Sequence, residues 1–224
     1  MSDDPTGPGG TPDGSDPLPT DLADVFPSYD EIDDPALRAG VRDAYALALA
    51  ETGWDDLRAV PWLPDEQARL GLPDETNVEH VNDVAALATA LADELLARRP
   101  GLGLDRDIVV AGALVHDISK LYEFSPEGAA AGDGRAADAT DADATDDDRS
   151  SVGTDYYDLL GHPYVGVHVC EAAGLPVALS HIVLSHTGRT SVEPATPEAE
   201  VVKRADEVAA AAIRSRALAD LRDA

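Results

Sequence analysis

A histidine and an aspartate stand next to each other within an apolar part of the chain. His116 and Asp117 directly follow a run of Ile, Val, Ala, Gly and Leu that spans Ile108 to Val115. Buried charged or polar groups need pairing, hydrogen bonds or a metal ion to offset the loss of water. Further imidazoles and carboxylates precede and follow the pair, at His80, His162, His186 and Asp206. These residue types, drawn from several helices, predict a metal site.

The spacing around this pair indicates how it could act. On a helix His116 and Asp117 stand about 100° apart, so both reach one ion only if it lies between them. Because a carboxylate has two oxygens, Asp117 could also bridge to a second ion. Lys120 follows His116 by four residues, one helical turn, so we expect its ammonium to face the same site and hold a phosphate oxygen.

These residues resemble a known family, the HD-domain metal-dependent phosphohydrolases. His80, the pair His116-Asp117 and Asp206 match its H…HD…D signature, and Lys120 stands at its usual lysine. The resemblance runs from about Asn77 to Ala212 and is interrupted by one insertion. Its later part is similar to a branch that includes the HD domains of bacterial 3′→5′ exoribonucleases, with archaeal dihydroneopterin cyclic phosphate phosphodiesterases as plausible relatives. The resemblance implies an all-α fold, the HD-domain helical bundle.

The resemblance also implies a set of metal ligands. His80, His116, Asp117 and Asp206 would hold a first ion, and Asp117 would bridge to a second ion held by His162 and His186. We expect Fe or Mn at these positions, with Co, Ni or Zn as alternatives for a mixed histidine and carboxylate site. His181 also stands at a family position, where it would either support the ligands or bind metal itself.

Two such ions would clamp the attacking and leaving oxygens of a displacement at phosphorus. A bound ion can bring the pKa of water from ~15.7 to about 7, so the expected nucleophile is a metal-bound hydroxide. Asp117 and Lys120 would then be the catalytic residues. Lys120 and Arg189 would bind the substrate phosphate.

Composition limits the possible ligands and the cellular environment of the protein. The chain has 224 residues, 44 of them acidic against 16 Lys and Arg, and its net charge of −28 resembles that of haloarchaeal proteins. It lacks a basic stripe with stacking aromatics for a long nucleic acid strand, although screening in molar salt means that nucleic acid is not excluded. A single cysteine, Cys170, favours a reducing interior. With neither a leader nor a long apolar segment, we expect a cytoplasmic protein that does not span a membrane.

The sequence also predicts the elements that position these residues. Residues 1–33 read as a disordered acidic arm, residues 34–224 as the HD domain, and residues from about 125 to 153 as a low-complexity acidic insertion. We expect a helix after Asp34, and a packed irregular segment at residues 54–73 that could cover one side of the cleft. Further helices should span residues 78–98 with His80, 106–120 with the His-Asp pair after an N-cap at Asp105, 160–173, 176–187, and 197–221 with Asp206.

The favoured function is hydrolysis of a phosphoester in a small nucleotide-like or cyclic phosphate substrate, as a phosphodiesterase rather than a phosphomonoesterase. The exoribonucleases resembled here carry an OB-fold before the HD domain, whereas the corresponding arm of this chain is short and acidic. One alternative is nevertheless a 3′→5′ exoribonuclease-like phosphodiesterase. Another is a non-catalytic nucleotide-sensing HD domain. The oligomeric state stays open.

Overall fold

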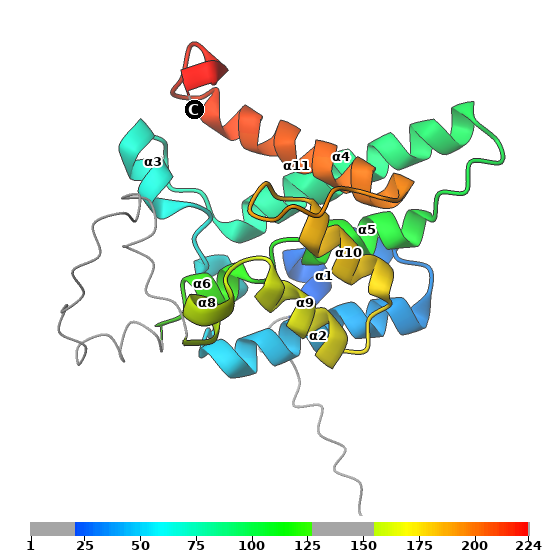
Figure 1. Cartoon of the computed structure of the whole chain (residues 1–224), viewed down its shortest axis with the longest axis horizontal. Helices are drawn as coiled ribbons and strands as arrows, with labels where there is room; N and C mark the ends of the chain where they lie inside the picture. Colours follow the sequence, from blue (N-terminus) through cyan, green and yellow to red (C-terminus); the bar gives the residue numbers. More distant parts are fainter. Residues whose placement is uncertain (1–20, 127–154, 224) are drawn as a thin grey trace, which may run out of the picture.

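The computed structural model describes residues 21–126 and 155–223. These residues form helices joined by loops, with one isolated bridge between Pro61 and Thr76 and no strand in the described ranges (Figure 1). The predicted all-α class is therefore confirmed. The helices are α1 (Leu22–Val25), η1 (Pro27–Glu31), α2 (Pro35–Thr52), η2 (Leu57–Ala59), α3 (Pro64–Leu70), α4 (Asn77–Arg98), α5 (Arg106–Val115), α6 (Lys120–Glu123), α8 (Asp155–Leu160), α9 (Tyr164–Ala172), α10 (Val177–Ser185), α11 (Pro197–Arg214) and η5 (Leu221–Asp223).

Helix α5 lies at the centre of the molecule and contacts α2, α4, α10 and α11 (Figure 1). It begins, as predicted, after Asp105, whose side chain accepts hydrogen bonds from the backbone N–H groups of Asp107 and Ile108. All its residues from Val109 to Val115 are buried. The apolar run therefore forms the middle of the core, and it holds the His-Asp pair at its carboxyl end.

Helices α4 and α11 pack against each other and against α5, on the side away from α2 (Figure 1). A capping box between Thr76 and Glu79 begins α4, and Thr196 caps α11 ahead of Pro197. Such caps satisfy N–H groups that the first helical turn leaves without partners. The two helices bring His80 and Asp206 to the same end of α5.

Close approach of α10 to its neighbours depends on two glycines. A Cβ added at Gly112 of α5 would lie 2.4 Å from Ile182 Cδ1, and one added at Gly166 of α9 would lie 2.7 Å from Val183 Cγ1. Ile182 and Val183 are both fully buried. The two glycines thus allow α10 to pack close to α5 and α9, which places the carboxyl end of α10 at the site.

The structure differs from the prediction at several places. The segment at residues 54–73, predicted to be irregular, contains η2 and α3, and the helix predicted at residues 160–173 begins at Tyr164. Residues 21–33, assigned to a disordered arm, fold into α1 and η1, and they bury Leu22, Val25, Phe26 and Ile32 in the main core. The helix with the His-Asp pair ends at Val115 instead of continuing to Lys120, and the last long helix ends at Arg214. The rest of the predicted arm, residues 1–20, and nearly all of the predicted insertion lie outside the described residues.

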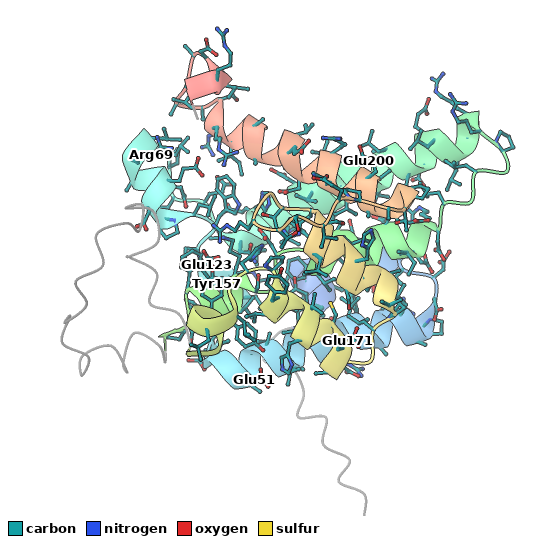
Figure 2. All side chains as sticks on the ribbon, in the orientation of Figure 1. Glu51, Arg69, Glu123, Tyr157, Glu171 and Glu200 are labelled. Carbon is teal, nitrogen blue, oxygen red and sulfur yellow. The ribbon has the colours of Figure 1, made fainter. Side chains whose placement is uncertain are left out.

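Helix α6 connects the centre of the molecule to α2 and α8. The Tyr122 hydroxyl donates a hydrogen bond to Glu51 on α2, while Glu123 faces Tyr157 of α8 (Figure 2). In the described ranges, the helices lack the combination of length and apolarity needed to cross a membrane.

Candidate metal centre

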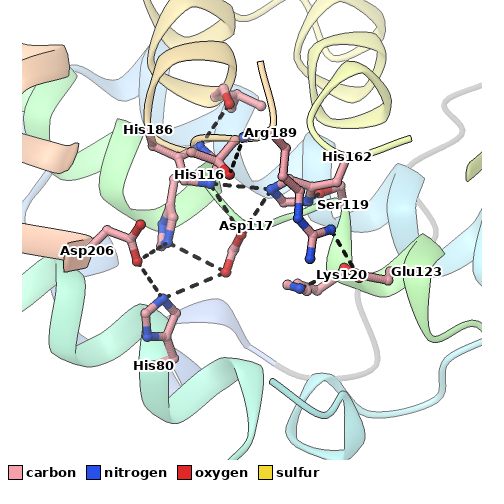
Figure 3. A network of polar contacts seen from close by, with 12 residues as sticks. His80, His116, Asp117, Ser119, Lys120, Glu123, His162, His186, Arg189 and Asp206 are labelled. Carbon is pink, nitrogen blue, oxygen red and sulfur yellow. Dashed lines mark hydrogen bonds and ion pairs between the residues drawn. The ribbon is translucent and has the colours of Figure 1, made fainter. Parts of the chain in front are cut away.

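The six predicted ligands converge from five parts of the fold (Figure 3). Each contributes a ligand atom to one of two groups, and within a group these atoms lie within 4.8 Å of one another. The first trio consists of His80, His116 and Asp206. The second trio consists of Asp117, His162 and His186. Segments separated by more than a hundred residues of sequence thus build one site.

The turn after α5 places His116 in the first trio and Asp117 in the second. Past Val115 the backbone tightens, because the N–H of Ile118 donates to the Val115 carbonyl and the N–H of Lys120 donates to the Asp117 carbonyl. Tyr45 of α2 also donates from its hydroxyl to the carbonyl of Leu114, at 2.5 Å. These hydrogen bonds satisfy carbonyls that a helix end would otherwise leave without partners.

Asp117 lies close to the histidines of both trios. Its Oδ1 is 3.4 Å from His162 Nε2 and 3.5 Å from His186 Nε2. Its Oδ2 is 3.7 Å from His80 Nε2 and 3.8 Å from His116 Nε2. Asp206 completes the first trio, with Oδ1 3.0 Å from His80 Nε2. The two oxygens of one carboxylate therefore face two separate sets of imidazole nitrogens.

Local hydrogen bonds orient the imidazole rings. His116 Nδ1 donates to the carbonyl of Ala113 at 2.7 Å, and His186 Nδ1 donates to that of Val183 at 2.8 Å. The Nε2 of His116 therefore keeps its lone pair free to bind an ion. Within the described residues, the buried His116 Nε2 has no hydrogen-bond partner. Buried polar atoms are rarely left without partners, so this nitrogen fits a metal ligand.

The protonation states also suit a metal site. Burial lowers the pKa of His116 and brings the pKa of His162 well below its usual range. Burial alone would raise the pKa of Asp117, but His116 and His186 hold that pKa well below its usual value. Burial would likewise lower the pKa of His186, but the hydrogen bond to Asp117 raises it. The neutral imidazole that burial favours at His116 and His162, beside the ionised carboxylate of Asp117, is the donor form that divalent metals bind.

A cavity of about 400 Å³ opens over both trios. Trp62 and Leu63 line it, as expected for the segment at residues 54–73, and the Trp62 ring stacks on His80 with 5.1 Å between ring centroids. Four cations also line it: Lys120, Arg189, Lys203 and Arg214. In so acidic a chain, this cavity combines candidate metal ligands with the positive charge that a phosphate requires.

Several residues at the site have roles that the sequence analysis missed. The hydroxyl of Ser119 hydrogen-bonds with His162 Nδ1. Glu123 accepts a hydrogen bond from Lys120 Nζ at 2.7 Å and another from Arg189 Nη1 at 3.3 Å. The opposite charges of Lys120 and Glu123, three residues apart, were the one signal that could have revealed Glu123.

His181 lies apart from this centre. It belongs to neither trio and does not line the cavity. Its Nε2 instead accepts a hydrogen bond from the backbone N–H of Ala195 at 2.9 Å. The side chain therefore supports the loop between α10 and α11, and neither trio includes it as the metal ligand that was one of its two expected roles.

Comparisons with known proteins agree with this architecture. The HD domain family matches residues 77–211, which is more than half of the chain. A dihydroneopterin 2′,3′-cyclic phosphate phosphodiesterase from Methanocaldococcus jannaschii is 31% identical over 134 residues, which make up 58% of this chain and 44% of that relative. The chain thus matches less than half the length of this relative, and no solved structure matches. With the family's signature residues gathered at one site, the chain belongs to the HD domain family.

Proposed function

We propose that the protein is a metal-dependent phosphohydrolase acting on a small nucleotide-like or cyclic phosphate substrate. The observation that carries this proposal is that Asp117, a member of the second trio, also faces the histidines of the first, at a cavity lined by cations. The name of the relative supports a phosphodiester as the substrate, because that protein is a cyclic phosphate phosphodiesterase.

The ligand arrangement fits two divalent ions. The first trio would hold one ion and His162 with His186 the other, while each Asp117 oxygen would reach one of them. The resemblance to the HD family favours Fe or Mn, and a mixed set of imidazoles and carboxylates also suits Co, Ni or Zn. When bound, such ions would supply Lewis-acid activation of water and of the phosphoryl group.

The protein's own residues would bind and orient the substrate. Lys120 and Arg189 would bind phosphate oxygens at the edge of the metal centre, and Asp117 would fix the relative position of the two ligand sets. Trp62 and Leu63 would close the cavity on another side. A cavity of about 400 Å³ suits a compact ligand. Trp62 is 2% exposed and offers little ring surface for stacking bases, which favours a small substrate over an RNA strand.

The test combines metal content with hydrolysis. Protein purified anaerobically without chelators is analysed by mass spectrometry, then assayed on 2′,3′-cyclic nucleotides, linear phosphoesters and short oligoribonucleotides. We expect about two ions per chain and hydrolysis of the small esters. Asp117→Asn should abolish both, whereas Asp83→Asn, which changes an exposed carboxylate on α4, should abolish neither.

Other outcomes would point elsewhere. Shortening of oligoribonucleotides from the 3′ end, with small esters left intact, would favour the exoribonuclease alternative. Metal binding without hydrolysis of any ester would favour a nucleotide sensor. Protein that binds no metal, even after addition of Mn or Fe, would refute the proposal.

A further inference from the structure

Two cations at the cavity wall share one buried carboxylate (Figure 3). Glu123 Oε2 lies 2.7 Å from Lys120 Nζ, and Glu123 Oε1 lies 3.3 Å from Arg189 Nη1. The side chains of Lys120 and Glu123 are 5% and 7% exposed. Lys120 also lies over the ring of Phe124, 5.3 Å from its centroid. We call Lys120, Glu123 and Arg189 the shared-carboxylate cluster.

The other two cations of the cavity wall each have a carboxylate of their own. Lys203 Nζ lies 3.2 Å from Glu193 Oε2. Arg214 donates to both oxygens of Glu66, at 2.8 and 3.0 Å. Among the four cations that line the described cavity, Lys203 and Arg214 are therefore each balanced by one carboxylate. In the shared-carboxylate cluster, two cations and one carboxylate leave a single positive charge.

Glu123 itself does not line the cavity, although both of its partners do. It can therefore act on a substrate only through the charge and position of Lys120 and Arg189. Its location follows from the single turn of α6, which sets Lys120 and Glu123 three residues apart on one face.

We infer that Glu123 determines specificity by leaving one positive charge for the substrate phosphate, which favours a phosphodiester over a phosphomonoester. A diester carries one negative charge at neutral pH, whereas a phosphate monoester carries about −1.5 to −2. A cluster with one positive charge matches the charge of the diester, and a second uncompensated cation in the cluster would attract the monoester more strongly. This inference rests on the proposed function, since it concerns the phosphate of that substrate.

The test measures binding of two simple probes to the Mn-loaded protein by calorimetry at fixed ionic strength. Methyl phosphate represents the monoester, and dimethyl phosphate represents the diester. Glu123→Gln raises the charge of the cluster by one, and Arg189→Gln lowers it by one. Because the metal ions contribute equally to all variants, their effect cancels when the ratio of the two dissociation constants is compared with that of the wild type.

Glu123→Gln should shift that ratio toward methyl phosphate by on the order of tenfold, as expected for one unit charge near the phosphate. Arg189→Gln should shift it by a similar factor toward dimethyl phosphate. Glu51→Gln provides the matched control, because it removes a negative charge from an exposed residue that bonds the hydroxyl of Tyr122. The control should leave the ratio unchanged.

Two results would overturn the inference: an unchanged ratio in the folded variants, or a wild-type protein that binds neither probe. Glu123→Gln also leaves the buried Lys120 without a carboxylate and so costs stability, which circular dichroism would report. Arg189 is half exposed, so Arg189→Gln still tests the inference if the first variant does not fold. The assay needs no turnover. Probe binding with the expected shifts but without ester hydrolysis would therefore refute the proposed function and leave the charge inference standing.

Discussion

At the scale of single residues, the site depends on how one carboxylate is shared. Asp117 lies 3.4 to 3.8 Å from the Nε2 atoms of four histidines. Burial would raise the pKa of this carboxyl, but His116, His186, Lys120 and His162 hold that pKa well below its usual value. Each of the other five candidate ligands belongs to one trio only, so a substitution can alter one trio without the other.

This separation predicts different metal losses. His116→Gln should remove the ion bound by the first trio, and His186→Gln should remove the ion bound by the second. Each substitution removes one imidazole from a group of three candidate ligands. Mass spectrometry of the purified variants should find about one ion per chain in each case. His181→Gln, which alters a histidine outside both trios, should keep the wild-type content. Loss of both ions from either variant would contradict the independence of the two trios.

The candidate ligands could be identified from the sequence because imidazoles and carboxylates are the side chains that bind metal ions. His80, His116, Asp117 and Asp206 also match a signature with fixed local context, and the structure brings them together. The supporting residues could not be found in this way. Ser119 bonds His162, and Trp62 stacks on His80, but serine and tryptophan have no fixed role at those positions. Their roles come from contacts between distant segments, which a residue list does not contain.

At the scale of elements, the carboxyl ends of α5 and α10 must meet for the two trios to adjoin. Gly112 allows this approach, because a Cβ there would lie 2.4 Å from the buried Ile182 side chain. We expect Gly112→Ala to lower the free energy of unfolding by about 1–3 kcal/mol through overpacking. Denaturant unfolding measures the change. Gly103→Ala, at a position with no atom within 4 Å, is the control, and equal effects of the two substitutions would refute this packing argument.

Helix α1 and the 3-10 helix η1 are the elements that the sequence analysis did not predict. Their apolar residues are few and lie among Asp, Pro and Ser, so the local composition resembled a disordered arm. Burial against α2, α4 and α5 stabilises them, and that contribution is visible only once the tertiary contacts are known. The end of α5 was missed for a similar reason. Its apolar periodicity continues through Ile118 and Leu121, although the backbone has already changed its hydrogen bonding.

The contribution of this N-terminal element can be measured at Phe26. Its side chain is 1% exposed and packs against the Tyr45 ring, with 5.0 Å between centroids. Phe26→Ala should lower the free energy of unfolding by about 3–5 kcal/mol, as for other buried aromatic truncations. Val177→Ala, at a side chain 76% exposed, should change it by less than about 0.5 kcal/mol. Chemical denaturation of both variants tests the difference. A small loss for Phe26→Ala would mean that residues 21–33 add little to stability.

At the scale of the whole molecule, 44 acidic residues outnumber 16 Lys and Arg. The net charge of −28 requires the folded chain to hold many carboxylates closer together than they lie in the unfolded state. Many cations are already engaged in pairs, such as Arg106 with Glu31 and Asp93, and Arg204 with Glu200 and Glu207. The excess carboxylates therefore repel one another, and solvent ions must offset that repulsion.

The same excess charge predicts a rise in stability with salt. The Debye length falls from about 10 Å at 0.1 M to about 3 Å at 1 M, which screens repulsion between surface carboxylates. We therefore expect the thermal unfolding midpoint, followed by circular dichroism, to rise as KCl increases over this range. Sucrose serves as the control for preferential exclusion, because it stabilises proteins without screening charge. The buried ion pair of Lys120 and Glu123 is shielded from bulk ions, so its contribution should change little. A midpoint that responds equally to sucrose and KCl would show that exclusion from the protein surface, and not screening of carboxylate repulsion, causes the rise in stability.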